Sequence, residues 1–269
     1  MIMENTKKII VKWYKRLGFP AAFDEAFAAV ADTVEIPEDT CIETYDLDCP
    51  DGQKNLLSFL YMCEAVEKRY AQLGIGEDIL IDTLQDIVRW TENWSIVKDT
   101  LCLYELPWLE RIMGSRLFKV GRLQFYMAPA RESVPSHGIQ KGENVVELHI
   151  PRGEKLSPEA VAESMARGKE FLQTYFPEFE YRYFTCISWL LDETLQKYLP
   201  EDSNIIRFGN LFDRVFTQES DILIRFLFRW DTTVETLPQM VCKTSFHEKI
   251  KNAVLGGARF YVTAGVIRK

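Results

Sequence analysis

Hydrophobic residues in the first part of the chain recur at three- and four-residue spacings, which is the period of an amphipathic helix. This spacing predicts four helices, at residues 5–16, 21–31, 53–73 and 77–94, and an acidic loop at 37–52. The two longer helices are separated by Gly74, Ile75 and Gly76, a turn that favours an antiparallel helical hairpin. We therefore expect residues 1–113 to form a helical domain.

After residue 113 the hydrophobic pattern changes to a period of two, which is typical of half-buried strands. Strands are predicted at residues 117–127, 144–150, 182–190, 221–228 and 258–267. Helices are predicted at 157–176, at 192–199, and from a capping box of Ser245 and Glu248 to Gly256. Strands that alternate with helices predict a mixed α/β layer, so residues 114–269 form a second domain and the whole chain is α+β.

The charge is uneven along the chain, and this narrows the class of partner. The net charge of −8 at pH 7 comes from the first part. Residues 1–113 hold 11 basic and 21 acidic residues, against 21 and 19 in the remainder. The acidic first part would repel a polyanion, which argues against a nucleic-acid partner. The more basic second part suits an anionic small molecule.

The sequence lacks the patterns that indicate a membrane span, a secretion signal or a metal site. No stretch approaches the roughly 18 apolar residues of a membrane span, and the first residues show no signal-peptide pattern. The six cysteines contain no C-x-x-C pair, which is typical of reduced thiols, and the three histidines have no metal-ligand spacing. We therefore expect a soluble cytoplasmic protein with no metal site and no membrane partner.

The segment after the strand at 144–150 is the strongest candidate for a binding site. Its loop reads Pro151-Arg152-Gly153-Glu154-Lys155-Leu156, and Ser157 and Pro158 open the next helix. Free backbone N–H groups and the helix dipole at such a start attract phosphate oxygens. Arg152 can add a charge-assisted contact, and Gly153 permits a close approach. Loops of this form also occur without a ligand, and Glu159 in the first helical turn opposes an anion.

Two further groups of residues carry possible chemistry. Glu147 and His149 are neighbours on one face of their strand, where they either take a proton from an amine or form a structural pair. Cys186 and Ser188 share a face of a later strand, but no base lies near Cys186 in the sequence, so we expect a buried apolar role for it. For Arg225, inside an apolar run, we expect an ion pair.

Three segments of the second domain resemble those of bacterial GNAT-like acyltransferases. They are residues 149–153 with 156–159, then 187–192, and then 199–200 with 203–205. The helical first part is similar to the N-terminal domain of the same proteins. The resemblance covers essentially the whole chain, and its specific motifs all begin at or after His149.

The resemblance implies a GNAT-like fold, in which the two central strands of a mixed sheet splay apart and admit an acyl-CoA. The pyrophosphate would rest on the strand–loop–helix segment, whose candidate contacts are Ile150, Arg152, Gly153, Lys155, Leu156 and Ser157. The implied reaction is direct attack of a small-molecule or peptide amine on the thioester, in a ternary complex. The broader superfamily carries small residues where this loop has Glu154 and Lys155, so either a modified phosphate cradle or a loss of CoA binding is expected.

The same resemblance suggests catalytic roles. Glu147 or His149 is the candidate base, the backbone N–H near Ile150 donates to the oxyanion, Ser188 polarises, and Tyr198 is a candidate acid. The leading hypothesis is an N-acyltransferase that uses acetyl-CoA or another acyl-CoA and no metal. The alternatives are a non-catalytic sensor of CoA or a metabolite and a partner-binding module on the same fold. The acceptor, the acyl length and the oligomeric state are left open.

Overall fold

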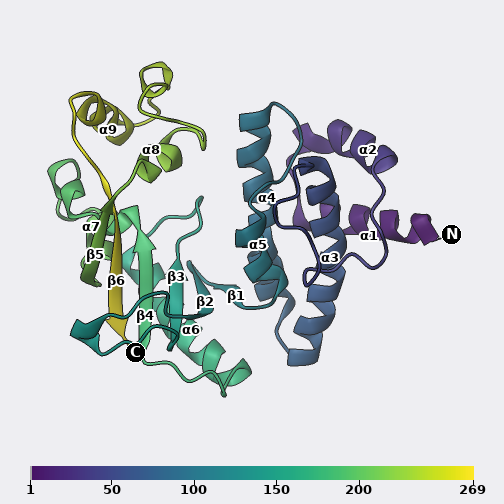
Figure 1. The fold of residues 1–269 in the computed structure, drawn as a ribbon, viewed down its shortest axis with the longest axis horizontal. Coiled ribbons are helices and arrows are strands. Elements are labelled where there is room, and N and C mark those ends of the chain that lie inside the picture. Colours follow the sequence, from purple (N-terminus) through teal and green to yellow (C-terminus); the bar gives the residue numbers. More distant parts are fainter. Residues whose placement is uncertain (1) are drawn as a thin grey trace. The chain divides into compact units, whose positions relative to one another are not determined.

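The computed structural model describes residues 2–269, with side chains from residue 4 onward (Figure 1). The chain divides into two compact units, Met1–Val120 and Gly121–Lys269, and each unit is described by itself. Within the described residues, no helix combines the length and the apolar character that crossing a bilayer requires.

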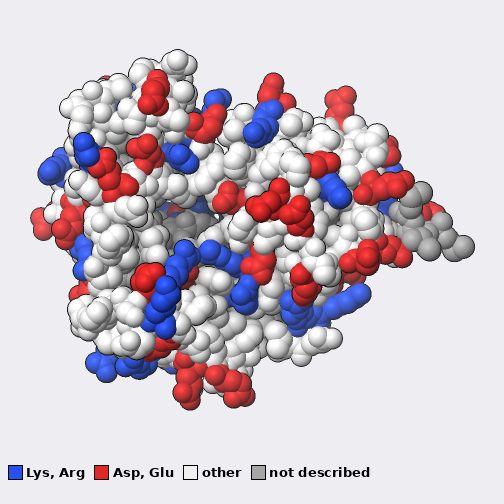
Figure 2. All heavy atoms as spheres, in the orientation of Figure 1, with Lys and Arg blue, Asp and Glu red and all other residues white. Residues whose placement is uncertain are grey.

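The first unit is helical, as the three- and four-residue spacing predicts. Its helices are α1 (Ile2–Leu17), the 3-10 turn η1 (Ala21–Phe23), α2 (Asp24–Thr33), α3 (Gly52–Leu73), α4 (Glu77–Lys98) and α5 (Leu106–Met113). Asp51 caps α3, and Gly74 ends it with a left-handed φ of 74° that permits the turn into α4. Trp13, Leu60 and Ile87 are fully buried and mark a core shared by α1, α3 and α4. Acidic side chains are spread over the face of this unit that Figure 2 shows.

The second part of the chain holds most of a mixed sheet. The strands are β1 (Leu117–Val120), β2 (Leu123–Pro129), β3 (Asn144–His149), β4 (Tyr183–Ser188), β5 (Asp213–Glu219) and β6 (Tyr261–Arg268), in the order β1-β2-β3-β4-β6-β5. The helices of this part are η2 (Pro135–His137), α6 (Pro158–Tyr175), η3 (Trp189–Leu191), η4 (Glu193–Lys197), α7 (Asn204–Gly209), α8 (Ile222–Leu227), η5 (Leu237–Gln239) and α9 (Ser245–Leu255). A helical part followed by a mixed sheet with helices confirms the predicted α+β class.

The two central strands separate soon after they meet. Within the described chain, the parallel strands β3 and β4 pair at two positions, Val146 with Phe184 and Glu147 with Thr185. Beyond that point β3 stays paired with β2 as far as His149, while β4 stays paired with β6 as far as Ser188. Each strand therefore follows its outer neighbour, and the carboxyl ends of β3 and β4 splay apart as predicted.

Helix α6 packs against one face of the sheet through a glycine. A Cβ atom at Gly168 would overlap the ring of Phe125 on β2. Phe125, Leu148 and Phe184 are buried and belong to this face of the sheet. Because successive residues of a strand point to opposite faces, Glu147 and His149 of β3 lie on the face away from α6.

Two predicted strands end differently in the structure. The strand predicted over 117–127 is two strands, β1 and β2, because Gly121 turns the chain with a φ of 67° and lies against Ser164 of α6. The strand predicted over 182–190 stops at Ser188, where the Ser188 hydroxyl accepts from the N–H of Leu190 and starts the turn η3.

The strand predicted over 221–228 is wrong, since this run forms the helix α8. A short apolar run has no period that separates a buried strand from a buried helix. Arg225, for which we expected an ion pair, is exposed on α8. The strand in this region is instead β5, an edge strand with mostly exposed, polar residues that the hydrophobic pattern did not reveal.

The capping box at Ser245 is also wrong by one residue. Thr244 is the N-cap of α9, and its hydroxyl accepts from the N–H of His247. The predicted end of this helix, at the Gly256–Gly257 pair, agrees with the structure.

The packing at Gly168 predicts a stability change. Gly168→Ala places a methyl group against Phe125 and is expected to destabilise the protein by about 1–3 kcal/mol, despite the better helix propensity of alanine. Urea unfolding measures this change. Thr174→Ala, at an exposed position of the same helix, is the control and should stay within about 0.5 kcal/mol of the natural protein. A Gly168→Ala protein as stable as this control would contradict the packing.

Candidate functional site

The Glu147–His149 pair lies where β3 and β4 begin to separate. The Glu147 side chain is only 5% exposed, and its Oε2 lies 3.9 Å from Nε2 of His149. Arg131, from the loop after β2, donates from Nη2 to both carboxylate oxygens of Glu147, at 3.0 and 3.2 Å. The two residues are therefore neighbours, as predicted, and the Arg131 guanidinium, which no sequence pattern indicates, completes the group.

Residues at the end of β4 serve two different purposes. Ser188 accepts from the N–H of Leu190 at 3.1 Å, so its oxygen helps to shape the turn after the strand. Cys186 is fully buried, and burial, with a smaller effect of Glu147, raises the pKa of its thiol far above the usual value. A thiol in this environment is not ionised at neutral pH, so Cys186 is an apolar packing residue, as expected, and not a nucleophile.

The loop between β3 and α6 is held in place by a buried arginine and by the N-cap of α6. Arg122 is 6% exposed, and its Nε donates to the Lys155 carbonyl at 3.2 Å. Gly153 has a φ of 111°, a conformation that other residues rarely adopt. Ser157 accepts from the N–H of Ala160 at 3.2 Å and caps α6, as predicted. The loop therefore runs directly into a capped helix start, while the side chains of Lys155 and Glu154 are exposed.

The start of α6 already holds a carboxylate. Hydrogen bonds from its own backbone N–H and from the Ser157 hydroxyl hold the pKa of Glu159 below its usual value, and Arg207 and Lys155 add attraction. Glu159 is fully exposed, so these charges act in high-dielectric surroundings. The helix start thus favours negative charge, and an incoming phosphate would compete with Glu159 for the same groups.

Arg152 points toward α8. Its guanidinium donates to the carbonyl oxygen of Phe226 and lies 5.9 Å from the centre of the Phe226 ring. Partial burial lowers the pKa of Arg152. Arg152, a predicted contact of the phosphate, is therefore hydrogen-bonded to α8 in this structure. Its side chain would have to rotate to contact a phosphate.

A groove of about 420 Å³ lies between α6 and α7, beside the loop that joins β3 to α6. Apolar side chains form most of its lining, among them Leu156, Val161, Phe208 and Ile267. Asn204 and Arg207 of α7 add polar groups beside the helix start. Residues 203–205 carry part of the family resemblance, whereas no sequence pattern indicates a role for Arg207. The N-cap at Ser203 is the local signal that could have placed Arg207 on a short helix.

Tyr198 lies apart from the Glu147–His149 pair. Its ring packs 5.4 Å from that of Phe260, in an apolar cluster that includes Leu195 and Ile250. Among the described residues, no contact joins the Tyr198 hydroxyl to β3.

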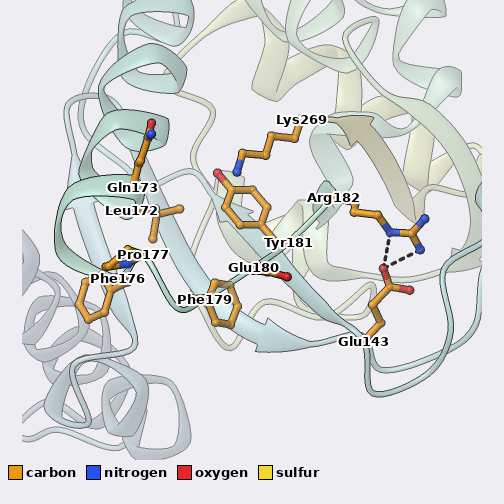
Figure 3. A pocket seen from close by; sticks show the side chains of 10 residues that line it. All are labelled: Glu143, Leu172, Gln173, Phe176, Pro177, Phe179, Glu180, Tyr181, Arg182 and Lys269. Carbon is orange, nitrogen blue, oxygen red and sulfur yellow. Dashed lines mark hydrogen bonds and ion pairs between the residues drawn. The ribbon is translucent and has the colours of Figure 1, made fainter.

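A second hollow of about 690 Å³ lies at the opposite end of β4 (Figure 3). Arg182 and Glu143 form an ion pair on one side of it, at 2.7 Å, and Lys269 lies 4.2 Å from the centre of the Tyr181 ring. Leu172, Phe176 and Phe179 provide apolar walls. This hollow lies at the amino end of β4, whereas β3 and β4 separate toward the carboxyl end of β4, so the two are distinct.

The splayed parallel strands, the capped helix after the first of them, and the groove beside that helix define a GNAT-like acyltransferase fold. Family models agree with this class. The model described as "GNAT-like C-terminal domain" matches residues 117–267, and the one described as "N-acyltransferase N-terminal domain" matches residues 11–114. The chain belongs to this family of GNAT-like N-acyltransferases.

Solved structures share the architecture. An acyltransferase in complex with decanoyl-CoA and teicoplanin has a TM-score of 0.78 and 21% identity, covering 95% of this chain and 86% of that one. A mutant acyltransferase in complex with octanoyl-CoA has a TM-score of 0.79 and 20% identity, covering 98% and 88%. At this identity the likeness establishes the fold. No curated protein matches the chain.

The burial of Cys186 predicts its reactivity. Iodoacetamide should modify the partly exposed Cys41 and Cys242 in the native protein and leave Cys186 unmodified until the protein is unfolded in urea. Mass spectrometry of tryptic peptides measures this difference. Native alkylation of Cys186 at the rate of Cys242 would contradict the buried, protonated thiol.

Proposed function

We propose that this chain transfers an acyl group from an acyl-CoA to an amine by direct attack within a ternary complex. The observation that best supports this is the separation of β3 from β4 after Glu147 and Thr185. Past this point, the backbone groups of β3 that face β4 can hydrogen-bond an extended pantetheine arm as a missing strand would. The loop and the start of α6 follow immediately, where a pyrophosphate is electrostatically favoured.

The phosphate end of the cofactor would lie between the loop and α7. Backbone N–H groups between Ile150 and Ser157, except at Pro151, which has none, would face the pyrophosphate, with Gly153 allowing close approach and Leu156 forming an apolar wall. Arg152, once rotated away from Phe226, and Lys155 supply positive charge. Arg207 adds a charge from the other wall of the groove.

His149 is the proposed base, and Glu147 orients it. Glu147 already accepts two hydrogen bonds from Arg131, which leaves its oxygens less suited to receive a proton than the imidazole next to it. The amine nitrogen attacks the thioester carbon as its proton passes to His149, and the C–S bond breaks to release CoA thiolate. The backbone N–H near Ile150 donates to the oxyanion. Ser188, on the strand that borders the splay, is the proposed polarising group. Tyr198 is the candidate acid for the leaving thiolate.

The complexes of structural neighbours support the donor class. Those acyltransferases bind decanoyl-CoA or octanoyl-CoA, and one also binds teicoplanin. For this chain we propose an acyl-CoA donor, from acetyl-CoA upward in chain length, and an amine on a small molecule or peptide as acceptor.

Two substitutions test the phosphate site with opposite signs. Arg207→Gln should weaken CoA binding about three- to tenfold, whereas Glu159→Gln should tighten it by a similar factor, because the competing carboxylate is removed. Both effects should shrink in 0.5 M salt because the charges are exposed. Isothermal titration calorimetry with CoA measures them, and Lys197→Gln, an exposed lysine on η4, is the charge-matched control. Equal affinities across all four proteins would overturn the placement of the phosphates.

The base assignment predicts a loss confined to turnover. His149→Gln should lower acyl transfer by about 10²- to 10⁴-fold while CoA affinity and melting temperature stay unchanged. Release of CoA thiol in the presence of an amine panel measures transfer. If the natural protein binds CoA yet consumes no thioester with any acyl-CoA and amine, the chain is a CoA sensor instead. If His149→Gln retains full turnover, the base lies elsewhere.

A further inference from the structure

Arg131 stands at a fixed place beside the proposed base. The backbone pairing of β2 and β3 continues past the ends of the strands, since Ala130 donates to Glu143 at 2.7 Å and Gly142 donates to Ala130 at 2.8 Å. The residue after Ala130 therefore leaves a clamped backbone. From there its side chain reaches across to β3, where Glu147 accepts from it.

The Arg131–Glu147 pair is asymmetric in its exposure. Glu147 is 5% exposed, whereas the Arg131 side chain is 58% exposed. Both contacts to Glu147 use one nitrogen, Nη2. Within the described residues, the N–H groups on Nε and Nη1 have no hydrogen-bond partner. A buried carboxylate thus holds an exposed guanidinium in one orientation with donors to spare, which is an arrangement suited to binding an anion.

The anion would lie on the open face of the sheet, next to the base. Oε2 of Glu147 lies 3.2 Å from Nη2 of Arg131 and 3.9 Å from Nε2 of His149, so the guanidinium and the imidazole flank one carboxylate oxygen. Tyr126, which is half-buried, and Ile187, which is exposed, lie on the same face, away from α6. A ligand that contacts both Arg131 and His149 therefore carries its anionic group within a few bonds of its amine.

We propose that Arg131 is a specificity-determining residue that binds a carboxylate of the acceptor, so that the acceptor is an amino acid or a peptide-like acid. This inference rests on the proposed function. A single negative charge fits better than a phosphate dianion, because Glu147 already balances part of the charge of Arg131 and would repel a second negative charge. Glu147 accordingly serves two positioning roles, one toward Arg131 and one toward His149.

Matched acceptor pairs test the inference. The pairs are amino acids and their amides, and short peptides with a free or an amidated C-terminus, which differ in the carboxylate and keep the amine. The natural protein should favour each acid over its amide. Arg131→Gln should lower the preference for acids over amides, measured as the ratio of their kcat/KM values, about ten- to a hundredfold, mainly through a higher KM for the acids. Arg131→Lys should recover part of the preference, because a lysine keeps the charge.

Arg182→Gln is the matched control, since Arg182 is 60% exposed and, like Arg131, pairs with a glutamate, but with Glu143 and not with Glu147. It should leave the acid preference unchanged. Equal use of acids and amides by the natural protein, or an equal loss for both in Arg131→Gln, would overturn the inference. The second result would mean that Arg131 only positions Glu147.

A binding measurement separates this inference from the proposed function. Calorimetry with the CoA-bound protein should show tighter binding of the free-acid peptides than of the amidated ones, and Arg131→Gln should abolish the difference. Absence of acyl transfer together with this binding difference would reject the reaction and keep the carboxylate site. Equal binding of both peptides to the natural protein would reject the site, whether or not transfer occurs.

Discussion

The early separation of β3 and β4 is the constraint on which the rest of the site depends. Hydrogen bonds to β2 and β6 hold the two strands on diverging courses after Glu147 and Thr185. A sheet that opens in its middle exposes backbone donors and acceptors, which are costly to leave unpaired away from water. Such an opening is stable when an extended ligand can complete it, and the loop and helix that follow β3 supply the place where an anionic end of that ligand is favoured.

Around this opening, groups that attract an anion lie close to groups that oppose one. Glu159 at the start of α6 and the hydrogen bond of Arg152 to the Phe226 carbonyl both reduce the attraction of this region for an anion. Arg207 acts in the opposite sense from the far wall of the groove. On the other face, Glu147 holds Arg131 and lies beside His149, so one buried carboxylate links the proposed base to the proposed acceptor site. In the proposed arrangement, the cofactor and the acceptor meet the sheet from different sides of the same two strands.

Much of this fold could be predicted from the sequence, because its hydrophobic periods are strong. The α3–α4 hairpin, β3 and α6 appear where the spacing and the capping residues place them. The errors have physical causes. The apolar run of α8 has no distinguishing period, and β5 is a polar edge strand whose pairing with β6 depends on residues distant in sequence. Arg131 and Arg207 were missed because their importance comes from neighbours that only the fold provides.

Hydrogen–deuterium exchange of the protein with and without a non-hydrolysable acyl-CoA analogue tests the central claim most directly. The account predicts slower exchange of the backbone amides at residues 148–157 and 186–189 when the analogue is bound, because the ligand would complete the opened sheet and cover the helix start. Protection confined to other segments, such as the hollow around Tyr181, or no protection at saturating analogue, would contradict it.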